Sequence, residues 1–175
     1  AQWHAVGGGV DGAVEAMAVH NGYLVRGGCF ENAGGHSAHQ VARWDGVFLE
    51  PIGAGLNCTV RALAVYNGEL FAGGSFMKAG SDSASYVARW DGYGWRGADS
   101  GMDNEVRALV VYEGELIAAG AFTKAGRGLA SNIARWNGSV WHALGGGVSS
   151  SEELDRGAFA LAVYGDELIV GGSID

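Results

Sequence analysis

Proline, cysteine and basic residues are all scarce in this sequence. Among its 175 residues there is one proline, and 11 Lys and Arg face 19 Asp and Glu, a formal net charge of −8. Because nucleic acids and anionic membranes attract basic surfaces, this balance disfavours both as partners. No apolar run reaches the roughly 20 residues of a membrane-spanning helix. The two cysteines, Cys29 and Cys58, lack the spacing of a disulfide framework or a zinc site, so we interpret them as structural thiols.

Glycine is abundant, and a six-residue motif recurs. VARWDG stands at 41–46 and 87–92, and IARWNG at 133–138, so the copies lie 46 residues apart. Gly9, Gly55, Gly101 and Gly147 keep the same step. The next copy is six residues longer because of an insertion at 149–157. Hydrophobic residues make up 48% of the chain, which is enough for a packed core. Self-similarity at this period is typical of repeat architectures.

Each copy of the repeat predicts four short strands. In the second copy, the apolar run 62–66 ends at Asn67-Gly68, 69–76 follows, and a polar loop leads to 86–90, which ends at Asp91-Gly92. A fourth segment begins near Trp95. Asn-Gly and Asp-Gly between apolar runs favour type I′ hairpins. No window shows a sustained helical period.

Four antiparallel strands in each repeat are typical of one blade of a β-propeller. The inner strands are apolar on both faces, as expected for blades packed between two neighbours. We therefore predict an all-β propeller of four-stranded blades, with about 3.8 blades in the chain. A solenoid of stacked sheets is the alternative.

The strand count divides one propeller segment into five parts. Residues 1–13 supply strand four of an incomplete blade, 14–59 and 60–105 are complete blades, 106–157 is a blade with an inserted loop, and 158–175 supply two strands of a further blade. Such a fan would expose apolar faces. We expect a homodimer that completes a ring, a fragment of a longer propeller, or a four-bladed monomer that lacks one strand.

The repeat also carries a family resemblance. LFAGGSFMKAG at 70–80 with ARWDG at 88–92 and Trp95, and LIAAGAFTKAG at 116–126 with ARWNG at 134–138 and Trp141, are its clearest copies. With these motifs the chain resembles kelch-like and galactose-oxidase-like propellers, and more closely bacterial surface or secreted repeat proteins. Fungal cortical polarity-marker proteins have similar repeats. The resemblance implies a scaffold and an extracellular or cell-surface location, but it transfers no activity. The copper and tyrosine-radical site of galactose oxidase has no matching residues here.

Residues that recur in every copy are most simply explained by the scaffold. The six tryptophans fall in two such registers, which predicts packing rather than exposed sugar platforms. Arg43, Arg89 and Arg135 also recur, as one partner of a repeated polar pair. Residues that break the register are better candidates for function.

Arg26 breaks the register, because its counterparts Ala72, Ala118 and Val170 are apolar. If Asn21-Gly22 is a two-residue turn, Met17 lies opposite Arg26 and Glu15 is its diagonal neighbour. Glu15 stands where other copies have Arg61 and Arg107. We therefore predict a Glu15–Arg26 ion pair near the central channel, where a ligand contact is the alternative interpretation.

The long loops between strands two and three, and after strand four, open on one face of a propeller. Binding residues concentrate on such loops. His36 and His39 lie there, but no third ligand has metal-site spacing, so we predict no metal and no cofactor. The acidic insertion with Glu152, Glu153 and Asp155 is the clearest candidate for specificity.

From these observations we predict a noncatalytic binding or structural module that recognises protein or glycan through its long-loop face. The alternative is a carbohydrate-active enzyme that uses two carboxylates near the channel.

Overall fold

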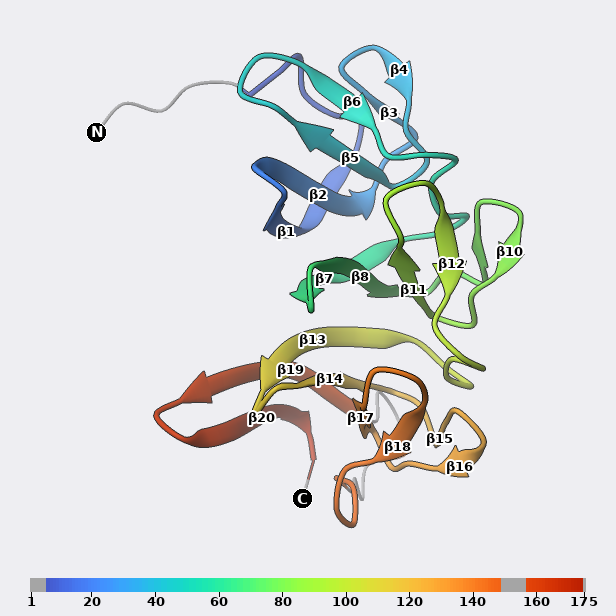
Figure 1. Ribbon diagram of the computed structural model, residues 1–175, viewed down its shortest axis with the longest axis vertical. Coiled ribbons are helices and arrows are strands. Elements are labelled where there is room, and N and C mark those ends of the chain that lie inside the picture. Colours follow the sequence, from blue (N-terminus) through green and yellow to red (C-terminus); the bar gives the residue numbers. More distant parts are fainter. Residues whose placement is uncertain (1–5, 149–156, 175) are drawn as a thin grey trace.

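The computed structural model describes residues 6–148 and 157–174. This part of the chain consists of strands and turns without a helix, so it includes none long and apolar enough to cross a membrane. The predicted all-β class is confirmed. Figure 1 shows the strands gathered into sheets that follow one another along the chain.

Three antiparallel four-stranded sheets form, one for each complete copy of the repeat. The first sheet has the order β1 (Ala13–His20), β2 (Tyr23–Cys29), β5 (Val41–Trp44), β6 (Leu49–Pro51). The second sheet has the order β7 (Val60–Tyr66), β8 (Glu69–Gly74), β11 (Val87–Trp90), β12 (Trp95–Gly97). The third sheet has the order β13 (Val106–Tyr112), β14 (Glu115–Gly120), β17 (Ile133–Trp136), β18 (Trp141–Ala143). The last strands, β19 (Gly157–Tyr164) and β20 (Glu167–Ser173), form a C-terminal hairpin.

The first strands of the successive units lie side by side. β1 contacts β7, β7 contacts β13, and β13 contacts β19. In Figure 1 the three sheets are stacked in chain order, with these first strands gathered toward one side. None of the described sheets closes on itself.

The polar loop of each copy contains a small hairpin that the sequence did not predict. These hairpins are β3 (Asn32–Ala33) with β4 (His36–Ser37), β9 (Lys78–Ala79) with β10 (Asp82–Ser83), and β15 (Lys124–Ala125) with β16 (Gly128–Leu129). Each hairpin is held by a capping side chain that lies just before the first strand of its unit, which in the third unit is β13. In the second unit, for example, Asn57 Oδ1 accepts hydrogen bonds from the backbone N–H groups of Met77 and Lys78.

The two kinds of predicted hairpin turn have different outcomes. Asn67 and Gly68 both have positive φ, 50° and 81°, as a type I′ turn requires. The Asp-Gly turns differ, because β11 ends at Trp90 and β12 begins only at Trp95. There the Asp91 carboxylate accepts backbone hydrogen bonds from Tyr93 and Gly94 and closes a longer turn. The type I′ prediction for Asp-Gly is therefore wrong.

The first strand of each unit contains a β-bulge. The register with the second strand shifts at Glu15, Arg61, Arg107 and Phe159. A bulge adds one residue and re-aims its side chain. The same position is thus singled out four times at the edge where the first strands meet.

The core lies between the sheets. Val25 and Val41 of the first sheet pack with Leu70 and Ala72 of the second. Phe71 of the second sheet packs in the same way with residues of the third, Val106 and Leu116 among them.

The outer-strand tryptophans tie neighbouring units together. Trp95 Nε1 donates to the Ile52 carbonyl at 3.0 Å, and Trp141 Nε1 donates to the Ala98 carbonyl at 3.2 Å. Both rings are buried. The predicted packing role of these tryptophans is confirmed.

Candidate functional site

The structure does not pair Arg26 with Glu15. Met17 does lie opposite Arg26 in the β1–β2 register, as predicted. However, Glu15 Oε2 accepts a hydrogen bond from Arg61 Nη1 at 3.2 Å, and the predicted Glu15–Arg26 pair does not form. The reason is the bulge at Glu15, which sequence periodicity could not reveal.

Arg26 is only 8% exposed and makes no hydrogen bond or ion pair with the described residues. Burial lowers the pKa of its guanidinium below the ordinary value.

Glu15 instead begins a charged row across the first strands. Arg61 Nε also donates to Glu105 Oε2 at 3.1 Å, and Arg107 donates to the other oxygen of Glu105. The guanidinium of Arg107 then lies 4.3 Å from the centre of the Phe159 ring. The four bulge residues and Glu105 therefore form one alternating row, in which each described charge has an opposite neighbour.

The two loop histidines have different surroundings. His39 Nδ1 lies 3.2 Å from Glu31 Oε2, and His39 Nε2 lies 3.2 Å from Ser37 Oγ. His36 instead lines a cavity of about 360 Å³ beside Phe48 and Glu50. The structure thus does not bring His36 and His39 to one site. Among the described residues, no group of three His, Cys, Asp or Glu side chains is arranged to hold a metal ion.

The acidic insertion was the leading candidate from sequence. Glu152, Glu153 and Asp155 lie outside the described residues.

The recurring arginines of the second and third units pair with a glutamate at equivalent positions. Arg89 pairs with Glu69 at 3.1 Å and Arg135 with Glu115 at 3.2 Å. Where Tyr23 replaces this glutamate, the Arg43 guanidinium lies 4.6 Å from the Tyr23 ring centre. The partners come from a neighbouring strand rather than from the Asp-Gly turn. This polar set belongs to the scaffold.

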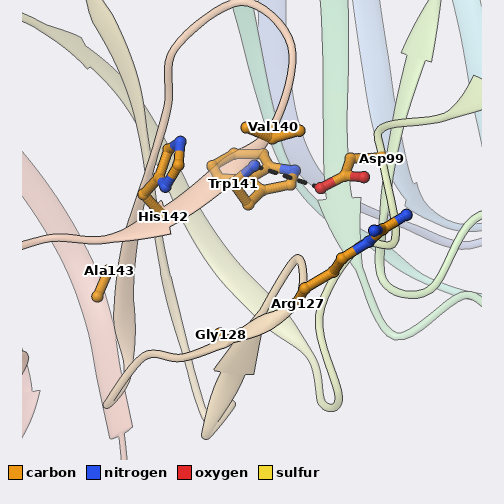
Figure 2. Close-up of a pocket in the computed structure, with 7 residues that line it drawn as sticks. All are labelled: Asp99, Arg127, Gly128, Val140, Trp141, His142 and Ala143. Atoms are coloured by element: carbon orange, nitrogen blue, oxygen red, sulfur yellow. Dashed lines mark hydrogen bonds between the residues drawn. The ribbon is translucent and has the colours of Figure 1, made fainter.

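A larger cavity, of about 480 Å³, lies at the outer edge of the third sheet. Its lining residues come from the segment after β12, the β15–β16 turn and β18, namely Asp99, Arg127, Gly128, Val140, Trp141, His142 and Ala143. Figure 2 shows Asp99 and Arg127 on one side of Trp141, with His142 and Ala143 on the other. Three polar groups of different character therefore surround an apolar floor.

The same position recurs in the other units with different residues. Asp99, Arg127 and His142 correspond to Gly53, Ser81 and Arg96 in the second unit, and to Gly7, Gly35 and Glu50 in the first. In the second unit Arg96 forms an ion pair of 3.3 Å with Asp82, the counterpart of Gly128. In the second unit this ion pair lies where the third unit has its cavity. Asp99 and Arg127 thus break the register, while His142 shares its register position with His4.

Asp99 is the most informative of them because of its backbone. Its φ is +56°, while its counterparts Gly7, Gly53 and Gly145 have φ of 58°, 60° and 56°. Glycine adopts this left-handed conformation without strain, whereas a side chain costs about 1 kcal/mol there. The chain therefore keeps a carboxylate where the local fold favours glycine.

The carboxylate of Asp99 is held only loosely. Its Oδ2 lies 3.5 Å from the Trp141 backbone nitrogen, and its Oδ1 lies 3.5 Å from Ser100 Oγ. Arg127 is exposed and has no hydrogen bond or ion pair with the described part of the chain. Both charged groups are consequently available to a ligand.

His142 is oriented by a neighbouring turn. Asn137 Oδ1 accepts hydrogen bonds from the backbone of Ser139 and Val140, which leaves Asn137 Nδ2 as the donor toward His142 Nε2 at 3.0 Å. In its neutral form His142 therefore carries its proton on Nδ1. The ring has one fixed acceptor and one free donor.

The candidate site was not predicted from the sequence, although Arg127 lies in one of the polar loops. His142 shares its register with His4, and Asp99 lies in a loop, so the repeat pattern alone does not mark either residue as part of a site. The signal that would have found Asp99 is the glycine at every described counterpart position. Only the structure shows that these residues share a cavity.

The cavity suits recognition of a polar ligand. A carboxylate and an imidazole can bind hydroxyl or amine groups, and a guanidinium can bind a carboxylate or hydroxyls. Asp99 is the one carboxylate among the seven described lining residues, whereas glycoside hydrolysis uses two. The carbohydrate-active enzyme stays a prediction without support from this cavity.

Comparison with known proteins adds no identity, because no family model matches the chain and a search of the curated proteins finds no match.

Proposed function

We propose that the chain is a noncatalytic binding module of the β-propeller type, which recognises protein or glycan at the cavity of Asp99, Arg127 and His142. The three antiparallel sheets with adjacent first strands support the propeller arrangement, because blades meet in this way around a central axis. The resemblance of the repeat motifs to secreted and surface proteins supports a location outside the cell or on its surface.

The observation that carries the proposal is the strained position of Asp99. Scaffold residues recur because every unit needs them, yet Asp99 replaces a glycine whose conformation it shares at φ +56°. It adds no strong hydrogen bond to the fold in return. Backbone strain without a structural gain is typical of functional sites. The open cavity beside Asp99 also holds Arg127, which forms no ion pair with the described residues, so both charges are available to a ligand.

The experiment replaces Asp99 and Arg127 with the residues that stand at their positions in the second unit, Gly53 and Ser81. A chain with Asp99→Gly and Arg127→Ser should lose binding to those immobilised glycans or peptides that the unchanged chain retains on arrays. It should fold normally and melt at the same temperature or above, because Asp99→Gly relieves left-handed strain of about 1 kcal/mol. Loss of binding with gain of stability separates a site defect from a folding defect.

A matched control is Ser81→Ala, which changes the corresponding loop of the second unit and should leave binding unchanged. Glycan and peptide arrays probed in parallel decide between the two ligand classes. Binding that persists in the Asp99→Gly, Arg127→Ser chain would contradict the proposed site. Absence of any retained glycan or peptide would contradict the proposed function.

A further inference from the structure

The first sheet and the C-terminal hairpin each expose a face that is buried elsewhere in the stack. On the first sheet, Met17 is 64% exposed, while its counterparts Leu63 and Leu109 pack against the core. On the hairpin, Ile169 is 45% exposed, while its counterparts Val25, Phe71 and Ile117 are buried. These two open faces point in opposite directions along the stack of sheets. One corresponds to the face that each sheet turns toward the preceding unit, and the other to the face turned toward the following unit.

The junctions inside the chain show how such faces fit. A Cβ placed on Gly27 of the first sheet would lie 2.4 Å from Cγ1 of Val60 and 3.4 Å from Leu63. A Cβ placed on Gly73 of the second sheet would lie 2.5 Å from Cγ1 of Val106 and 3.4 Å from Leu109. In both junctions a glycine leaves the space that a valine of the next unit fills. Val60 and Val106 are completely buried as a result.

The third junction has a different pair of residues at these register positions. Ala119 stands in the register of Gly27 and Gly73, opposite Ala108 of its own sheet. Ala158 of β19 stands in the register of Val60 and Val106, and it is completely buried. Glycine with valine is thus replaced by alanine with alanine. The pair therefore has three side-chain carbons in the first two junctions and two in the third.

The two open faces hold the unmatched members of a fourth pair. Gly171 of β20 stands in the register of Gly27, and a Cβ placed on it would meet only Ala160 at 3.9 Å. Val14 of β1 stands in the register of Val60 but is 39% exposed. Together they restore the glycine and valine combination of the first two junctions. Met17 would cover Gly171 as Leu63 covers Gly27.

We propose that two copies of this chain associate head to tail, with Val14 and Met17 of one copy packed on Gly171 and Ile169 of the other. The occupant is a second copy because the chain itself carries both complementary surfaces with the size pairing of its internal junctions. Two such contacts related by a twofold axis close a ring, which removes both open faces. This association is separate from ligand binding, since the residues of the cavity do not take part.

The experiment measures the mass of the purified chain in solution by light scattering over a wide range of concentrations. We expect twice the mass of one chain. Gly171→Val should raise the dissociation constant about tenfold or more, because the added side chain occupies the space meant for Val14. Within one chain the substitution meets open space and an ordinary strand conformation, so melting at low concentration should be unchanged. Gly146→Val is the matched control, because a Cβ at Gly146 also has no atom within 4 Å.

A second variant distinguishes lost fit from general disruption. Val14→Ala with Gly171→Ala copies the alanine pair of the third junction, and it should keep the association that Gly171→Val loses. A chain that stays single at every concentration would overturn the proposal. So would association that Gly171→Val leaves unchanged, or an alanine pair that weakens it as much as Gly171→Val does.

Discussion

Arg26 stands in the first sheet where Ala72 and Ala118 stand in the second and third, and it is 8% exposed without a partner among the described residues. A charge partly removed from water without an opposite charge destabilises the fold, and this desolvation lowers the pKa of the guanidinium. Arg26→Met keeps the aliphatic stem and removes the charge. We therefore expect it to raise the free energy of unfolding by about 1 kcal/mol in urea denaturation.

The matched variant is Arg61→Met. Arg61 is partly exposed and contacts both Glu15 and Glu105, so its replacement should lower stability, by at most about 1 kcal/mol. If the free energy of unfolding rises for Arg26→Met and falls for Arg61→Met, the partners of each arginine, rather than its charge, decide its contribution to stability. A large loss from Arg26→Met would contradict this and would indicate an acceptor outside the described residues.

At the scale of elements, the Asp-Gly turns link stability to pH. Asp45 Oδ1 accepts backbone hydrogen bonds from Phe48 and Val47, which hold the pKa of its carboxyl below the usual value. A carboxyl with a lowered folded-state pKa adds stability above its unfolded pKa of about 4, and that stability disappears as the pH falls through the folded value. The third sheet has Asn137 in this role, with the same two backbone bonds.

Asp45→Asn should therefore keep the melting temperature at pH 7 and reduce its fall between pH 5 and pH 2, as followed by circular dichroism. Asp45→Ala removes the acceptor, so it should lower the melting temperature even at neutral pH. An Asp45→Asn chain with an unchanged acid profile would show that this turn does not contribute to the pH dependence.

Elements of this kind were only partly predictable from the sequence. Strand type, repeat length and the Asn67-Gly68 turn follow from local patterns of apolar residues and from the backbone preferences of asparagine and glycine. The bulge at Glu15 does not, because one added residue leaves the apolar alternation nearly intact on both sides. The cavity residue Asp99 was visible as a departure from glycine, but its proximity to Arg127 depends on how separate loops pack.

At the scale of the whole molecule, stability should depend on the fit between neighbouring sheets. Each described unit packs mainly on the units before and after it, as in other repeat proteins. The glycine and valine pairs then act as a spacing rule, in which the size of one residue is matched by its neighbour across the junction. A substitution at Gly73 or Val106 should consequently be judged by its partner rather than by its own burial.

A double-mutant cycle tests this rule. Gly73→Ala places a Cβ 2.5 Å from Val106 Cγ1, and overpacking of this kind should lower the free energy of unfolding by about 1–3 kcal/mol. Val106→Ala leaves a cavity and should cost a similar amount, about 1–3 kcal/mol. The double variant recreates the alanine pair of the third junction, so its loss in urea denaturation should be smaller than the sum by at least about 1 kcal/mol. Additive losses would mean that the junction relaxes independently at each residue, and the size pairing would then be without energetic consequence.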